Sequence, residues 1–114
     1  MSVNVLYSTT ATATGGPGNN PEQMFASGWS ACFLGAMKFV GGQKKQPIPA
    51  NTTVTTTIGI GPRSEGGFGL TAKLEVSLPG MDKAAAQKLV EEADQVCPYS
   101  NATRNNIAKE LNVV

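Results

Sequence analysis

The longest apolar segment of the chain, residues 20–42, predicts one long helix. Asn20 can cap the free backbone N–H groups at its start, and Glu22 complements the positive end of the helix dipole. Gly41 and Gly42 are expected to end the helix. Between these signals Lys38 is the only charge, and apolar residues fall on every face. The pattern therefore predicts a helix that is buried on all sides.

A helix that is apolar all round needs more cover than a chain of 114 residues readily supplies. A second subunit is the simplest cover. Gly28, Ala31 and Gly35 form a shallow ridge at three- and four-residue spacing, where another backbone can approach closely. We therefore expect a homodimer with a helix-on-helix core, and the alternative is a helix packed against its own sheet. The segment is too short and too rich in Ser and Gly to predict a membrane span.

The rest of the chain predicts four strands. Residues 3–14 alternate and are rich in Thr and Val, which is typical of a strand. Residues 50–61 and 68–78 also alternate and are joined by a Gly-rich turn, so they predict a hairpin with one face in water. Residues 107–114 form the last expected strand.

Two shorter helices are predicted between the hairpin and the last strand. Asp82 can cap the first one. Its apolar positions, expected to face the core, are Ala86, Leu89, Val90, Ala93 and Val96. The second begins with Cys97 at the cap and Pro98 at the first position, where free N–H groups favour a thiolate. The order β-α-β-β-α-α-β predicts a single α+β domain over residues 1–114.

Composition and charge exclude several classes of function. A formal net charge of +1 and one basic doublet, Lys44–Lys45, predict no nucleic-acid partner. The N-terminus shows no export signal, so we expect a cytoplasmic protein. Histidine is absent, which removes the usual catalytic base and the commonest zinc ligand. Two thiols without histidine or a CxxC motif predict no metal site and no bound cofactor.

The two cysteines, Cys32 and Cys97, are the most reactive groups of the chain. In a reducing compartment a purely structural disulfide is disfavoured. Two interpretations remain open at this point, because the thiols are either inert packing or a redox-active pair. Free cysteine is among the most buried residue types, so the residues alone favour packing.

Two segments nevertheless resemble a known family. Residues 20–26 with 30–36, and residues 96–107 around Cys97, are similar to the two cysteine motifs of organic hydroperoxide resistance proteins, in the osmotically inducible protein C family. The resemblance continues through residues 59–62, 67–69 and 78–80 and so covers nearly the whole chain. It implies an OsmC/Ohr-like fold, with antiparallel sheets around long central helices in an intertwined homodimer.

The resemblance also implies a thiol peroxidase that reduces alkyl and fatty-acid hydroperoxides to alcohols. Cys32 would be the peroxidatic thiolate that becomes a sulfenic acid, and Cys97 would condense with it to a disulfide. A lipoyl-type dithiol would then reduce that disulfide, with no membrane or nucleic-acid partner. Glu22 matches the glutamate that holds an active-site arginine in the family. Aromatic residues that suit an apolar peroxide, although each also fits a simple core, are Phe25, Trp29, Phe33 and Phe39.

One feature departs from the family. Its members carry a hairpin between the first strand and the helix cap, and the start of that hairpin holds the arginine. Here Gly16 passes almost directly to Asn20, and the two arginines, Arg63 and Arg104, do not match that position. The alternative function is therefore a catalytically impaired dimer that binds a lipid or hydroperoxide or senses oxidation.

Overall fold

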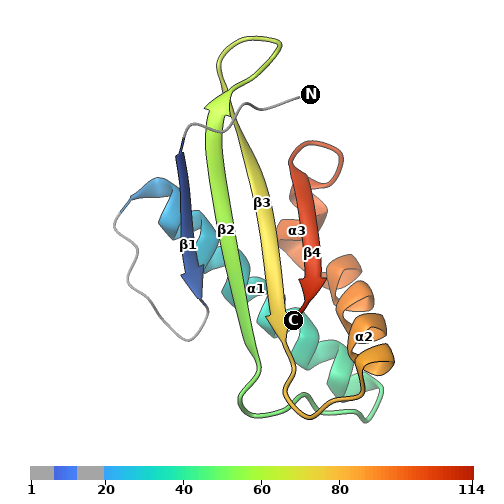
Figure 1. Cartoon of the computed structure of the whole chain (residues 1–114). Coiled ribbons are helices and arrows are strands. Elements are labelled where there is room, and N and C mark those ends of the chain that lie inside the picture. The colour runs from blue at the N-terminus through green and yellow to red at the C-terminus, as the bar shows by residue number, and fades with distance from the viewer. Residues whose placement is uncertain (1–6, 13–19) are drawn as a thin grey trace.

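The computed structural model describes residues 7–12 and 20–114, which form a four-stranded sheet and three helices (Figure 1). In chain order the elements are β1 (Tyr7–Thr12), α1 (Pro21–Gln43), β2 (Thr53–Pro62), β3 (Phe68–Ser77), α2 (Lys83–Val96), α3 (Pro98–Thr103) and β4 (Ala108–Val113). This is the predicted order, and the α+β class is confirmed. The outer parts of the expected first strand lie outside the described residues.

The sheet is mixed rather than purely antiparallel, with strand order β1-β2-β3-β4. β1 pairs antiparallel with β2, and β2 with β3 through the predicted hairpin. β4 instead runs parallel to β3, with Val76 opposite Val113. The parallel pairing follows from the connection between β3 and β4. Parallel neighbours need a crossover, and here α2 and α3 carry the chain back toward the start of β3 before β4 begins.

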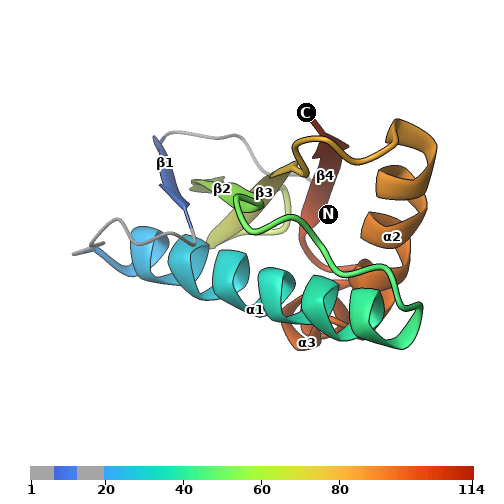
Figure 2. The ribbon, with the colours of Figure 1, turned by 90° about the horizontal axis from the view of Figure 1, so that it is seen from below.

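The helices fill one side of this sheet. α1 packs against β1, β2 and α2, whereas α2 and α3 lie toward β4 (Figure 2). The residues of β2 and β3 that are buried beneath the helices alternate as predicted: Val54, Thr56, Ile58, Ala72, Leu74 and Val76. Phe68 continues the alternation of this face but is 69% exposed, because it pairs with Pro62 next to the hairpin turn. Val96 is also exposed, at the last residue of α2.

α1 buries one face and leaves the other open. The Asn20 side chain accepts a hydrogen bond from the Gln23 N–H at 2.8 Å, which confirms the predicted cap. The buried residues are Ala26, Trp29, Ser30, Phe33, Ala36, Met37, Val40 and Gly41. On the opposite face Ala31 and Gly35 are exposed, and Met24 and Phe39 are 64% and 54% exposed. Burial on all sides is therefore wrong for the single chain.

The end of α1 differs from the prediction. The helix continues through Gly41 and Gly42 to Gln43, and the left-handed residue that follows is Lys45, with φ 57°. Gly41 has another role, since a Cβ there would lie 2.7 Å from the carbonyl oxygen of Gln46. The returning chain passes directly over this glycine, and the Gln46 N–H donates to the Gly41 carbonyl at 2.8 Å.

A buried pair of hydroxyls fixes α1 on the sheet. The Ser30 hydroxyl donates to Thr56 Oγ1 at 2.7 Å, and both residues are fully buried. A polar pair in an apolar layer has one good arrangement, so it restricts rotation of the helix. Cys32 follows two residues later and is thereby held on the side of α1 that faces α3.

Candidate active site

The structure brings Cys32 and Cys97 together. Their sulfur atoms lie 3.3 Å apart, within hydrogen-bond distance, although the two residues are 65 positions apart in sequence. Both are free thiols; Cys32 in the middle of α1 is half-buried and Cys97 before α3 is fully buried. A disulfide needs sulfurs about 2.0 Å apart, so a small approach would suffice to join them. The pairing favours a redox pair over two unrelated packing residues.

The first turn of α3 also contributes to this site. Cys97 is the N-cap residue and Pro98 takes the first helical position, as predicted, but the Cys97 side chain makes no capping hydrogen bond. The backbone N–H of Tyr99, one residue further on, hydrogen-bonds the Cys32 sulfur. The first N–H groups of a helix have no partner inside the helix, so they are free to bind such a group. α3 thus supplies Cys32 with both a second thiol and a backbone donor.

The pKa of the Cys32 thiol is raised above its ordinary value. Burial is the main cause, because it disfavours the charged thiolate. The Tyr99 N–H opposes this effect, whereas the neighbouring Cys97 adds to it, first through the hydrogen bond between the two thiols and then through charge repulsion. No cation of the described residues appears among these causes. A raised pKa is expected for a thiol that is partly buried without a nearby cation.

Two of the four aromatic residues that could suit an apolar peroxide lie in the core. Trp29 and Phe33 are fully buried. Phe25 is half-buried, and its ring lies 5.5 Å from Trp29 and 5.9 Å from Tyr99, where it is stacked. Only Phe25 therefore borders the surface beside α3, and the core interpretation holds for the other two. Phe39 lies on the open face of α1.

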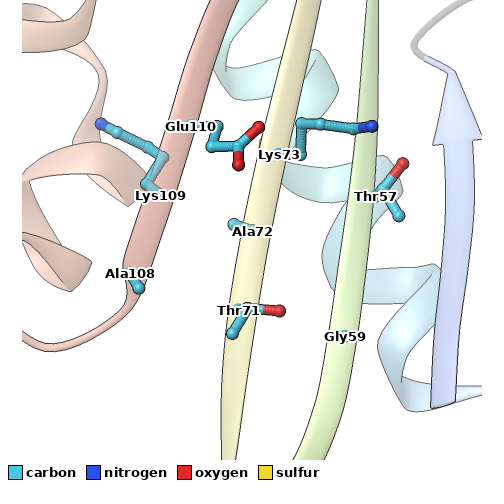
Figure 3. Close-up of a pocket in the computed structure, with 8 residues that line it drawn as sticks. All are labelled: Thr57, Gly59, Thr71, Ala72, Lys73, Ala108, Lys109 and Glu110. Carbon is cyan, nitrogen blue, oxygen red and sulfur yellow. The ribbon is translucent and has the colours of Figure 1, made fainter. Parts of the chain in front are cut away.

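Two cavities of the described residues lie away from the cysteine pair. One of about 470 Å³ opens on the outer face of β2, β3 and β4, where Thr57, Lys73 and Glu110 project (Figure 3). Another of about 430 Å³ lies between the second half of α1 and the loop around Ile48. Neither of these two cavities is lined by a cysteine.

Glu22 is not brought to the cysteines within the chain. α1 is one continuous helix, Pro21–Gln43, with no break near Ser27 and Gly28 that could bring Glu22 closer to Cys32. Ten residues of helix place Glu22 about 15 Å from Cys32 along the axis. A role for Glu22 at the sulfurs stays a prediction that requires a partner subunit.

The arginines also lie apart from the pair. Arg63 follows β2 at the hairpin turn, 3.8 Å from Glu65. Arg104 ends α3 and donates to the Asp94 carboxylate and backbone carbonyl. Neither occupies the position of the family arginine, and none of the described residues replaces it beside Cys32.

Three further residues at this site were missed by sequence reasoning. Asp94, in the last turn of α2, binds Ser100, Arg104 and Lys109. The buried Ser100 hydroxyl also accepts a hydrogen bond from the Trp29 indole at 3.2 Å. Tyr99 acts through its backbone, which no side-chain pattern reveals. The usable signal was the placement of Asp94 and Ser100, three residues on either side of Cys97.

Comparison with known proteins settles the family. The sequence model of the family described as OsmC-like protein matches residues 13–112. The chain belongs to this family. An organic hydroperoxide resistance protein of Xanthomonas axonopodis pv. citri is 55% identical over 93 residues, which are 82% of this chain and 65% of that protein. The chain thus spans just under two thirds of the length of that relative.

Solved OsmC-like structures share the fold. A crystal structure of an organic hydroperoxide resistance protein from Elizabethkingia anophelis has a TM-score of 0.79 at 49% identity, over 83% of this chain and 67% of that one. The organic hydroperoxide resistance protein OhrB of Bacillus subtilis has a TM-score of 0.80 at 37% identity, over 90% and 75%. The OsmC/Ohr-like fold is therefore confirmed. Within the described ranges, no helix is both long and apolar enough to span a bilayer.

Proposed function

We propose that this chain is a cysteine-based peroxidase that reduces organic hydroperoxides to alcohols. The observation that carries the proposal is the 3.3 Å separation of the Cys32 and Cys97 sulfurs, one half-buried and the other fully buried. Family membership supports it, as does the name of the Xanthomonas relative. Alkyl and fatty-acid hydroperoxides suit the apolar surroundings that Phe25 and Tyr99 give the site.

The proposed chemistry uses both thiols in turn. The Cys32 thiolate attacks the terminal oxygen of the hydroperoxide, the O–O bond breaks, and the alkoxide leaves as an alcohol after taking a proton. Cys32 is then a sulfenic acid. The Cys97 sulfur attacks it, the S–O bond breaks, and water leaves as the disulfide forms. The Tyr99 N–H would stabilise the Cys32 thiolate at the start of this cycle.

A dithiol closes the cycle. One thiolate of a lipoyl-type dithiol attacks the disulfide to give a mixed disulfide, and its second thiol displaces the protein sulfur. The dithiol leaves as a cyclic disulfide, having supplied two electrons and two protons. No cofactor bound to the chain is needed for these steps.

Peroxide turnover with the purified chain tests the proposal. An alkyl hydroperoxide and dihydrolipoamide are supplied, and loss of hydroperoxide is followed. We expect turnover by the wild type and none by Cys32→Ser. Cys97→Ser should reach a sulfenic acid, captured with dimedone, but should not form the intramolecular disulfide. Full activity in Cys32→Ser would overturn the assignment.

The raised pKa of Cys32 supports a second function. With its thiolate disfavoured and no cation of the described residues beside it, the chain would react slowly and act as a binder or sensor of lipid hydroperoxides. A sensor would form the Cys32–Cys97 disulfide once with stoichiometric peroxide and fail to turn over with the dithiol. A peroxidase would do both.

We also propose that the functional unit is a homodimer in the cytoplasm. The open face of α1 presents Met24 and Phe39 around the small residues Ala31 and Gly35. A Cβ at Gly35 would meet no atom within 4 Å, so a second helix has room to approach closely there. Gly28, in contrast, is covered by Tyr99 of the same chain, so it does not belong to the open ridge that the sequence predicted.

A further inference from the structure

The cysteine pair depends on how α3 is docked. α3 is only six residues long, and its first turn carries both the Cys97 cap and the Tyr99 N–H that reach Cys32. An isolated helix of this length is unstable in water, so tertiary contacts must hold it. Cys97 is also the C-cap of α2, where its N–H donates to the Ala93 carbonyl at 2.8 Å, so the contacts that hold α2 and α3 together decide where Cys97 lies.

Asp94 collects most of these contacts. Its carboxylate binds Lys109 of β4, Ser100 of α3 and Arg104 directly after α3. Its backbone carbonyl accepts a second hydrogen bond from Arg104, at 2.8 Å. The side chain of Asp94 is only 15% exposed, so these charge-assisted bonds are partly shielded from solvent. One carboxylate thus joins the end of α2 to the first turn of α3, to the residue after α3 and to the last strand.

The network continues to α1. Ser100, which binds Asp94, accepts a hydrogen bond from the Trp29 indole at 3.2 Å, and Trp29 lies one helical turn before Cys32. The Lys109 ammonium lies 6.0 Å from the centre of the Trp29 ring. α1 and α3 are consequently linked by the buried hydrogen bond between Trp29 and Ser100. Ser100 is in turn hydrogen-bonded to the Asp94 carboxylate.

We propose that Asp94 is a positioning residue for the cysteine pair: its carboxylate holds α3 so that Cys97 and the Tyr99 N–H remain against Cys32. Asp94 does not touch the sulfurs, and it acts through Ser100 and Arg104. Its effect falls on the step in which Cys97 closes the disulfide, because that step needs the two sulfurs to approach by little more than 1 Å, from 3.3 Å. Its meaning for peroxide turnover rests on the proposed function, whereas the positioning itself does not.

Diamide separates positioning from peroxide chemistry. The Cys32 thiolate adds to its N=N bond, and Cys97 then displaces the nitrogen, so the reagent leaves as the hydrazine with two electrons and two protons while the disulfide forms. Asp94→Asn keeps the size of the side chain and removes its charge. We expect the closing step to slow by about tenfold in this variant, since small misplacements of reacting atoms have large effects on rate.

The control is Glu92→Gln. Glu92 lies two residues before Asp94 and pairs with Lys44 at 2.8 Å, away from α3. Loss of this partly exposed pair should change the closing rate by less than about twofold. Thermal unfolding and the rate of Cys32 alkylation are measured in all variants. A merely structural role would lower the melting temperature without changing the ratio of closing rate to alkylation rate.

Each outcome decides something. Slowed closing in Asp94→Asn with an unchanged control supports the inference, even if no hydroperoxide is consumed and the proposed function fails. Normal closing in a folded Asp94→Asn variant overturns it, even if peroxide turnover is found. If Asp94→Asn does not fold, Arg104→Gln removes one partner of the same carboxylate from its exposed side, and normal closing in that variant overturns the inference equally.

Discussion

Gly28 of α1 lies directly against the ring of Tyr99 in α3. A Cβ at position 28 would come within 3.4 Å of Tyr99 Cε2 and 3.5 Å of its hydroxyl oxygen. Tyr99 is two residues after Cys97, and its N–H reaches Cys32, so this contact is part of the geometry that joins the two thiols. A glycine that the sequence suggested for a subunit interface instead admits an aromatic ring of its own chain.

The first prediction follows from this contact. Gly28→Val should displace the Tyr99 ring, slow disulfide closure by diamide and destabilise the fold by about 1–3 kcal/mol, as overpacking does. Gly42→Val is the matched control, because a Cβ there meets no atom within 4 Å. Urea unfolding and the diamide reaction measure both effects. Equal behaviour of the two variants would contradict the role of Gly28.

The second prediction concerns the ionisation of Cys32. Its pKa is raised, first by burial, so its alkylation by iodoacetamide should reach half-maximal rate at a pH above that of a free cysteine, about 8.5. Cys97→Ser removes a neighbouring thiol that raises this pKa further, and the midpoint should therefore move to lower pH. Mass spectrometry of the labelled peptide across pH provides the measurement. A midpoint that rises in Cys97→Ser would show that the pair does not repel.

The third prediction concerns the open face of α1. The chain should be a homodimer that buries more than about 1,000 Å², and Gly35→Arg should convert it to a monomer by blocking close approach of two helices. Lys83→Ala, on the exposed start of α2, should leave the dimer intact. Light scattering at micromolar concentration distinguishes the species. A monodisperse wild-type monomer would refute the prediction.

The fourth prediction concerns Glu22. If the partner subunit brings Glu22 to the site, Glu22→Ala should slow oxidation of Cys32 by at least about tenfold, near 1.4 kcal/mol in the barrier, with little change in thermal stability. The same substitution in the monomeric Gly35→Arg background should then have no effect, because Glu22 and Cys32 lie at different heights on one straight helix. Stopped-flow oxidation rates test this. Unchanged kinetics with a small drop in melting temperature would leave Glu22 as a helix-dipole residue.

The fifth prediction concerns acid stability. Burial alone would raise the pKa of Asp94, but hydrogen bonds from Lys109, Ser100 and Arg104 outweigh it and lower the pKa below the usual range. The folded state thus binds this proton less readily than the unfolded chain does. Its stabilising effect is complete above the unfolded value of about 3.9 and is lost as pH falls through the folded pKa.

Asp94→Asn should accordingly be less stable than the wild type at neutral pH, and this difference should shrink as the solution is acidified below about pH 4. Urea unfolding over a pH series measures the difference. A constant difference across the series would show that the carboxylate charge is not what Asp94 contributes.

Local signals predicted most of the fold. Asn20 and Asp82 cap the helices that the pattern assigned to them, with side-chain bonds of 2.8 and 3.1 Å, and the alternation of the hairpin placed its core face correctly. Such features depend on neighbours within four residues. The parallel pairing of β4 could not be predicted, because a strand pattern carries no direction. Gly41 likewise looked like the end of the helix. A glycine is needed there because the backbone of residue 46 passes too close to leave room for a Cβ.

The site was only partly predictable. The cysteine motifs identified Cys32 and Cys97, but Asp94 and Ser100 act through contacts that require α2, α3 and β4 to be in place. Glu22 is the opposite case, since the rise of a straight helix is by itself enough to separate it from Cys32. Family resemblance assigned it a role that one chain cannot provide.

The unequal exposure of the two cysteines gives the site a direction of access. Cys97 has no surface in contact with solvent, whereas Cys32 keeps some. Any oxidant or reductant that arrives from solvent therefore meets Cys32 first. In the disulfide form, an incoming dithiol would attack Cys32 and release Cys97 as the departing thiolate. The inner sulfur would thus exchange electrons with the surroundings only through its neighbour, which shelters it from electrophiles that react indiscriminately with exposed thiols.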